Sequence, residues 1–219
     1  MRLVFLGKPG SGKGTQSKFI ATEFNIPAIS TGDLIRAAIK EGTPLGVEFK
    51  SFTSRGALVP DELVVAIVVE RLGQDDCSEG FLLDGFPRTI PQAVALENML
   101  RERSLPLESV LKLSVPDDLL TERAVGRRFC GGCGSSFHVK FAAPAVENTC
   151  DHCGFVGLHQ REDDRAEVVG TRIEEYNAKT APLIGFYAER KLLSEVDGVG
   201  SVADVESRIR GVLAPVGQS

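Results

Sequence analysis

The residues best suited to chemistry form a glycine-rich segment near the start of the chain. Residues 7–15 read Gly-Lys-Pro-Gly-Ser-Gly-Lys-Gly-Thr, which matches the G-x-x-x-x-G-K pattern of phosphate-binding loops. The glycines allow a tight turn that aims backbone N–H groups at an anion, and Lys13 would reach the terminal phosphates. Gly14 occupies the position usually held by Ser or Thr, so Thr15 is the nearest hydroxyl for a Mg²⁺ shell. A glycine-rich surface turn is the alternative interpretation.

A carboxylate and several arginines are the next candidates. Asp84 ends the apolar segment 80–84, where phosphate-loop enzymes have a carboxylate near Mg²⁺, although aspartate also ends many strands only to begin a turn. Arg88 follows closely and must lie near the same point. A guanidinium binds two phosphate oxygens at once and stays charged, which suits phosphoryl transfer. The other arginines near the ends of predicted elements, any of which could instead be a solvated surface residue, are Arg36, Arg123, Arg127, Arg128, Arg161 and Arg172.

Four of the five cysteines form two C-x-x-C pairs. The spacing of Cys130 and Cys133 from Cys150 and Cys153 is typical of zinc ribbons. Four thiolates close a tetrahedron around the ion and leave no position for water, so the metal would be structural. An iron–sulfur cluster and free thiols are the alternatives. His152 lies inside the second pair and could replace a cysteine as ligand, but with four cysteines available we expect it to be a bystander.

These residues need a scaffold that brings them together, and the sequence predicts a parallel sheet. Apolar segments at 1–6, 26–29, 80–84, 110–115 and 194–196 are strand candidates,. Helices are expected at 16–24, 34–40, 60–72, from 89, at 116–128, at 161–190 with a bend at Pro182, and at 202–213,. This alternation indicates an α/β fold with helices on both faces, in which ligands bind beyond the carboxyl ends of the strands. The phosphate loop and Asp84 should therefore face one crevice.

Composition limits the classes of function. The chain has 219 residues, 42% of them hydrophobic and 25% charged, with a formal net charge of −5. This balance argues against a general nucleic-acid or membrane surface. A zinc ribbon could still mark a nucleic-acid-binding module, but Lys140 is the only Lys or Arg between Cys130 and Cys153,. The apolar start of the chain is too short for a signal peptide or membrane span, so we expect a cytoplasmic protein.

Seven segments of the chain follow one another in a recognisable order. They are residues 7–16, Ser30-Thr-Gly-Asp-Leu-Ile-Arg36, Leu58-Val-Pro-Asp-Glu-Leu63, Gly80-Phe-Leu-Leu-Asp-Gly-Phe-Pro-Arg-Thr-Ile-Pro-Gln92, Gly126-Arg-Arg128, Arg161-Glu-Asp-Asp164 and Thr180-Ala-Pro-Leu-Ile184. Together they resemble the adenylate kinase family in its long form with a zinc-containing lid, and the Asp-Gly-Phe-Pro-Arg-Thr motif is especially specific. The resemblance runs nearly from end to end of the chain.

The resemblance implies a P-loop kinase that converts ATP and AMP into two ADP with Mg²⁺ and so serves adenine nucleotide homeostasis. It implies three parts: a core of residues 1–29, 60–125 and 164–219, an AMP-binding subdomain of residues 30–59, and a zinc-binding lid of residues 126–163. It also implies a monomer that acts on ATP, AMP and ADP without nucleic acid or membrane. The rival interpretations are a related nucleoside monophosphate kinase, such as a GTP-dependent AMP kinase, and a zinc-ribbon nucleic-acid-binding ATPase.

The family's site residues map onto this chain position by position. ATP would contact Gly10, Ser11, Gly12, Lys13, Gly14, Thr15, Arg127, Ser136, Phe137 and Gly200. AMP would contact Thr31, Arg36, Ala57, Leu58, Val59, Gly85, Phe86, Pro87, Arg88, Gln92, Arg161 and Arg172. The catalytic set would be Lys13, Asp84, Arg88, Arg123, Arg161 and Arg172. Zinc would bind Cys130, Cys133, Cys150 and Cys153.

The chain departs from the family pattern at few positions. Lys8 replaces a small residue, which predicts an added positive charge near the phosphates. Gly200 stands where the family often has a lysine that touches adenine through its backbone. Residues 142–144 read Ala-Ala-Pro in place of Asn-Pro-Pro. Asp163 and Asp164 resemble the acidic pair at the hinge where the lid returns to the core.

Overall fold

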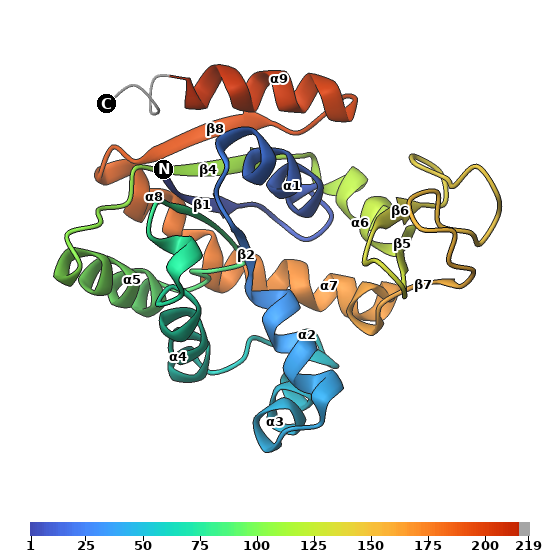
Figure 1. The fold of residues 1–219 in the computed structure, drawn as a ribbon, viewed down its shortest axis with the longest axis horizontal. Coiled ribbons are helices and arrows are strands. Elements are labelled where there is room, and N and C mark those ends of the chain that lie inside the picture. The colour runs from blue at the N-terminus through green and yellow to red at the C-terminus, as the bar shows by residue number, and fades with distance from the viewer. Residues whose placement is uncertain (215–219) are drawn as a thin grey trace.

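A parallel sheet forms the centre of the computed structural model, which describes residues 1–214 (Figure 1). Its strand order is β2-β3-β1-β4-β8. The strands are β1 (Arg2–Leu6), β2 (Ala28–Ser30), β3 (Phe81–Asp84), β4 (Ser109–Ser114) and β8 (Leu193–Asp197). Strands buried on both faces read as nearly continuous apolar segments rather than as an alternation, which is why these short runs could be recognised in the sequence. The predicted α/β fold is confirmed.

Successive residues of the central strands enter two separate apolar layers. Leu3 and Phe5 pack with α1 (Lys13–Phe24) and α9 (Val202–Leu213). Val4 and Leu6 pack on the opposite face with α4 (Asp61–Arg71), α5 (Ile90–Glu102) and α8 (Pro182–Glu189). This period of two places alternate side chains on opposite faces of the sheet, and Figure 1 shows the two helical layers on either side. The sheet therefore holds the carboxyl ends of β1, β2 and β3 in fixed positions.

Two helices project from one end of this core. Helix α2 (Thr31–Glu41) begins directly after β2, because the Ser30 hydroxyl accepts a hydrogen bond of 3.2 Å from the Asp33 N–H and caps the helix,. It therefore starts three residues before the predicted 34–40 helix. Helix α3 (Pro44–Thr53) begins after the Thr43 cap and packs back on α2, burying Phe49 completely. The pair lies away from the sheet in Figure 1.

A second, antiparallel sheet with the order β6-β5-β7 lies beyond α6 (Asp117–Val125). It contains β5 (Arg127–Cys130), β6 (Ser136–His138) and β7 (Leu158–His159). The expected helix over 116–128 is wrong at its end, because Arg127 and Arg128 lie on β5. Gly126 ends the helix where the His138 ring packs closely: a Cβ at this position would lie 2.3 Å from the ring.

The predicted helix at 161–190 is broken into four pieces. They are the 3₁₀ turn η2 (Glu162–Asp164), α7 (Ala166–Glu175), the π-helical turn η3 (Tyr176–Thr180) and α8. The π-helical turn η3 ends two residues before Pro182. Pro182 starts α8, at a position where the missing N–H of proline is tolerated,. A further 3₁₀ turn, η1 (Asp75–Cys77), precedes β3.

Residues 215–219, the end of the predicted core segment 164–219, lie outside the described residues. No helix within residues 1–214 combines the length and the apolar character needed to span a membrane.

Candidate functional site

The glycine-rich loop connects β1 to α1. Gly10 and Gly12 adopt left-handed backbone angles, with φ of 83° and 99°. Position 10 requires glycine for a second reason as well, because a Cβ there would lie 2.3 Å from the Leu120 carbonyl oxygen of α6. Helix α1 begins at Lys13 with Gly12 as its N-cap and, within residues 1–214, has no side-chain cap. Its first N–H groups and the positive end of its dipole are thus available to an anion.

Lys13 lies folded into this loop. Its Nζ donates hydrogen bonds of 2.6 Å to the Gly7 carbonyl and 3.2 Å to the Lys8 carbonyl. Burial lowers the pKa of Lys13 from 10.5 to about 8, although the nearby Asp84 carboxylate opposes the shift. The ammonium is therefore held by neutral carbonyl oxygens, and an added phosphate would be its strongest partner.

The positive charge expected from Lys8 is already paired. Its Nζ lies 2.7 and 2.8 Å from the two carboxylate oxygens of Asp117, at the start of α6. The departure at this position therefore joins the loop to α6, and its charge is largely balanced before any phosphate binds.

Strand β3 brings the predicted acidic group to the same edge of the sheet. In the register of the parallel strands, Asp84 lies beside Ser30 on one side and Phe5 on the other. Its Oδ2 accepts a hydrogen bond of 3.5 Å from the Ser17 hydroxyl of α1. Thr31 is 2% exposed and donates 2.8 Å to the Gly85 carbonyl. The carboxyl ends of β1, β2 and β3 thus meet as the alternation of elements predicts.

Hydrogen bonds made by both the backbone and the side chain of Arg88 hold it in place. Its Nε donates 2.8 Å to the Gly85 carbonyl, its N–H donates 2.7 Å to the Gln92 side chain, and its carbonyl accepts 2.9 Å from the Thr180 hydroxyl. Burial, followed by the positive charge of Arg172, lowers the pKa of Arg88 to about 10. Two cations held side by side at low solvent exposure form a site that favours a polyanion.

Asp61 is a positioning residue that the sequence did not reveal. Its two carboxylate oxygens accept 2.7 Å from the Gln92 side chain and 2.8 Å from the Thr89 hydroxyl. Gln92, 1% exposed, in turn holds the Arg88 backbone. In the sequence, residues 60–62 predict only the start of a helix. Asp61 lies beside Gln92 because α4 packs against α5.

A buried carboxylate gathers two of the other arginines. Asp164 is fully buried and accepts from Arg127 at Nε (2.9 Å) and Nη2 (2.5 Å), and from Arg172 at Nη1 (3.1 Å). The partly exposed Asp163 lies 3.3 Å from Arg172 and 3.8 Å from Arg36. Arg172, chiefly, and Arg36 hold the pKa of Asp163 below its usual value against the effect of burial.

Two cavities open on these residues and share part of their lining. The first, above the phosphate loop, is lined by Gly7, Pro9 and Lys13. The second, with a volume of about 340 Å³, lies beside α2 and is lined by Thr31 and Arg36. Both are bounded by Gly56, Leu58, Gly85, Arg88 and Arg172. A ligand in one cavity can therefore meet a ligand in the other next to Arg88.

The structure brings nearly all of the predicted AMP contacts to these cavities, but Lys13 is the only predicted ATP contact among the residues that line them. The predicted AMP contacts that line the second cavity are Thr31, Arg36, Ala57, Leu58, Val59, Gly85, Arg88, Gln92, Arg161 and Arg172. Phe86 is 1% exposed and belongs to the core. The other predicted ATP-binding and catalytic residues that line neither cavity are Gly10, Ser11, Gly12, Gly14, Thr15, Asp84, Arg123, Arg127, Ser136, Phe137 and Gly200. Arg123 instead donates 3.2 Å to the Gly198 carbonyl, close to Gly200. Phe137, 7% exposed, packs in the apolar cluster of the small sheet.

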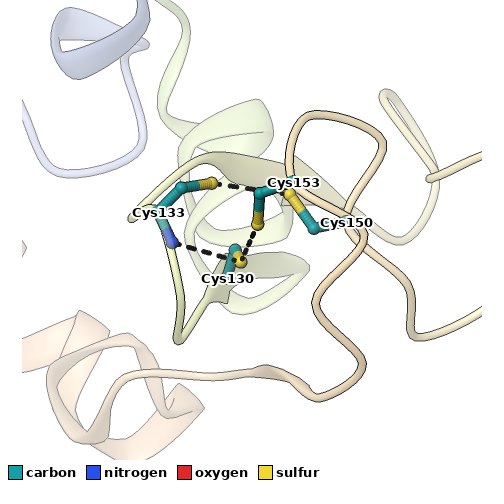
Figure 2. A group of neighbouring side chains, drawn as sticks. All are labelled: Cys130, Cys133, Cys150 and Cys153. Atoms are coloured by element: carbon teal, nitrogen blue, oxygen red, sulfur yellow. Dashed lines mark hydrogen bonds between the residues drawn. The ribbon is translucent and has the colours of Figure 1, made fainter.

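The four cysteines of the C-x-x-C pairs converge on one point (Figure 2). Their sulfur atoms all lie within 4.8 Å of one another. The Cys130–Cys153 and Cys133–Cys150 sulfur distances are 3.5 and 3.6 Å. Four sulfurs about 2.3 Å from a tetrahedral zinc ion stand about 3.8 Å apart, so the arrangement fits that metal. The group contains cysteines only and leaves out His152.

Comparison with known proteins agrees with this geometry. A family model described as adenylate kinase matches residues 5–192. The adenylate kinase of Carboxydothermus hydrogenoformans is 50% identical over 213 residues, which cover 97% of this chain and 99% of that relative. The adenylate kinase of Clostridium beijerinckii is 48% identical over 219 residues, with 100% of both chains covered. The chain belongs to the adenylate kinase family.

As an adenylate kinase, the protein is a phosphotransferase that reversibly converts ATP and AMP into two ADP, and members of the family use Mg²⁺ with ATP. The resemblance drawn from the seven sequence segments is confirmed. The full-length match to several enzymes named adenylate kinase favours this activity over the rival kinase and the nucleic-acid-binding ATPase.

Proposed function

We propose that ATP binds in the cavity above the phosphate loop and AMP in the cavity beside α2, with the transferred phosphoryl group between Lys13 and Arg88. The observation that carries this assignment is the lining shared by the two cavities: Gly85, Arg88 and Arg172 bound both of them. Two nucleotides bound in this way would meet through their phosphates and not through their bases.

On the ATP side, the residues of the phosphate loop from Gly10 to Thr15 would bind the phosphates through backbone N–H groups and the start of α1,. Arg127 would approach from the small sheet, Arg123 would reach the transferred phosphates, and the loop around Gly200 would border the adenine. A hydrogen bond of 3.2 Å to the Gly198 carbonyl joins Arg123 to that loop. Ser136 and the backbone of Phe137 would contact ATP only after the small sheet moves toward the core, because they line neither cavity.

On the AMP side, Arg36, Arg88, Arg161 and Arg172 would bind the phosphate, and residues 57–59 with Gln92 would surround the base and sugar. Phe86 and Pro87 would act by shaping the turn that carries Arg88. Transfer to AMP needs little help from a base, because the accepting phosphate is already ionised. Alignment of the two phosphates and neutralisation of their charge then supply most of the catalysis.

The residues fit Mg²⁺ at the same place. Among the hydrogen bonds of residues 1–214, the Asp84 carboxylate accepts only the long bond from Ser17, so it retains acceptor capacity beside the loop. Asp84 and Thr15 would hold the ion directly or through water. When bound, Mg²⁺ neutralises charge on the transferring phosphates.

We also propose that residues 30–59 and 126–163 move as separate units against a core of residues 1–29, 60–125 and 164–219. The adenylate kinase lid is a standard example of a closure that keeps water from the reacting phosphates. The small sheet joins the core through α6 and η2, which supports motion at these two ends. We further propose that the protein is a monomer that acts in the cytoplasm and binds no nucleic acid.

Zinc is the metal proposed for the four cysteines. Cys130 and Cys150 are buried and Cys133 and Cys153 exposed, so a bound ion would lie near the surface of the small sheet, closed off by four thiolates. Such an ion stabilises the lid and takes no part in the chemistry.

The experiment that tests the proposed function is a monophosphate panel. The purified protein is given ATP and Mg²⁺ with AMP, UMP, CMP or GMP at saturating concentration, and then AMP with GTP in place of ATP. We expect ATP with AMP to turn over fastest. Faster turnover with another monophosphate would reject the assignment of the second cavity, and preference for GTP would reject that of the first.

A further inference from the structure

The phenyl ring of Phe129 lies close to two arginines of the proposed site. The Cζ atom of Arg161 lies 3.3 Å from the ring centroid and that of Arg127 lies 5.2 Å from it. Phe129 is 7% exposed and belongs to β5, the central strand of the small sheet. Arg161 lines the second cavity, and Phe129 does not. The ring therefore lies outside the lining of the cavity that Arg161 borders.

The arginines of the site are held in two different ways. Asp164 accepts two hydrogen bonds from Arg127, and Asp163 and Asp164 hold Arg172. A carboxylate partner of this kind occupies N–H donors and neutralises charge. Arg161, in contrast, has within residues 1–214 only one such partner, Asp33, at 3.4 Å, and the Asp33 side chain is 63% exposed. An exposed pair of this length contributes little to fixing a side chain.

An aromatic ring can hold a guanidinium without using its donors. The attraction acts on the flat face of the guanidinium, while the five N–H groups point outward from its edge. The stacked face of Arg161 thus leaves its fork free for two phosphate oxygens. Burial, followed by the positive charges of Arg36 and Arg127, lowers the pKa of Arg161 to about 10.

We infer that Phe129 is a positioning residue for phosphate binding: it holds Arg161 by its face, so that the edge of the guanidinium is presented to AMP at full charge. The inference rests on the proposed role of Arg161 in the second cavity. Leucine at this position would keep the strand and the apolar volume but would remove the π face.

The test is a double-mutant cycle on kcat/KM for AMP with the full-length enzyme. A cation–π contact at a partly desolvated site stabilises by an amount that corresponds to about 2- to 30-fold in affinity. We expect Phe129→Leu to lower kcat/KM for AMP by a factor in this range and to have no further effect in the Arg161→Ala background. Phe129→Tyr, which retains a ring, should keep kcat/KM near that of the parent.

The control is Phe155→Leu. Phe155 also belongs to the small sheet region, lies over Gly131 and Gly132, is 44% exposed, and has no cation over its ring among the described residues. The Phe155→Leu substitution should leave kcat/KM for AMP unchanged. Melting temperature and metal content are measured for every variant, so that loss of the small sheet is recognised.

The outcomes separate two failures. If Arg161→Ala itself leaves kcat/KM for AMP unchanged, the proposed role of Arg161 is wrong. If Arg161→Ala is impaired but Phe129→Leu lowers kcat/KM by the same factor in both backgrounds, Phe129 acts only through folding and the inference is overturned. Impairment of Phe129→Tyr equal to that of Phe129→Leu would overturn it as well.

Discussion

Replacing Asp164 by asparagine should destabilise the protein more than any other single change of a carboxylate in the site. Asp164 is fully buried, and its two oxygens accept three hydrogen bonds from Arg127 and Arg172. Asparagine has nearly the same shape, but it removes the negative charge and turns one acceptor into a donor that faces a guanidinium. The two arginines would then share one neutral oxygen.

The expected size of the effect follows from the exposure of the partners. Removing one member of a buried ion pair costs about 3–5 kcal/mol, because the other charge stays buried without compensation. The side chains of Arg127 and Arg172 keep 29% and 19% exposure, so water can recover part of their solvation. We therefore expect the lower end, about 3 kcal/mol, which corresponds to a fall in Tm of roughly 6–12 °C for a chain of this length.

Thermal unfolding of Asp164→Asn is compared with Asp163→Asn as the matched control. Asp163 has an adjacent position and the same charge, but its side chain is 22% exposed and its ion pairs are longer, at 3.3 and 3.8 Å. We expect its Tm to fall by less than half as much. An Asp164→Asn variant that melts within about 2 °C of the parent would refute the reasoning. So would equal losses in the two variants, since burial would then not be the deciding factor.

Three further outcomes are expected. Elemental analysis should find close to one zinc per chain, and the Cys150→Ser/Cys153→Ser variant should melt lower yet keep residual activity at low temperature, because the core has its own apolar layers; a variant that melts no lower than the parent would contradict the zinc site. Burial lowers the pKa of Lys13 to about 8, so kcat/KM for ATP should fall as the pH rises through that value and the free enzyme loses the ammonium charge. The value of kcat should change less, since bound phosphates restore the charge. A flat kcat/KM profile between pH 7 and 9 would contradict this. Lys13→Ala should abolish transfer and barely move the Tm, and measurable turnover would count against its role.

The parts of the site that the sequence revealed are those made by neighbours along the chain. The loop from Gly7 to Lys13 could be recognised because strand, glycines, lysine and helix follow one another directly,. The carboxyl end of β3 was predictable for the same reason, since Asp84 and Arg88 lie in one segment. The parallel order then placed both at one edge of the sheet,.

Contacts between distant segments could not be predicted in this way. Asp61 meets Gln92 only because α4 packs against α5, and the ring of Phe129 meets Arg161 only because β5 and β7 pair. The sequence predicts Arg127 and Arg128, the first two residues of β5, as the end of a helix, which is wrong. Residues 127–130 have no local signal that outweighs the preceding helical segment, and the strand is set by its two partners and by the His138 ring against Gly126.

The charge of Lys8 illustrates the same limit. From the sequence, a lysine inside the phosphate loop predicts a stronger positive field. In the structure, Asp117 at the start of α6 pairs with it at 2.7 Å. Only the fold shows that the two segments touch, so the effect of this departure on phosphate binding had to be read from the structure.

The central claim, that Arg88 lies where the two nucleotides meet and acts as a two-pronged clamp, is tested most directly by kcat of Arg88→Lys at saturating ATP and AMP. Lysine keeps the positive charge but loses the fork that binds two oxygens at once, so we expect a loss on the order of 10²-fold or more, with Lys8→Ala as a control that loses far less. Near-parental turnover of Arg88→Lys would contradict the account, because charge alone would then suffice at the junction of the two cavities.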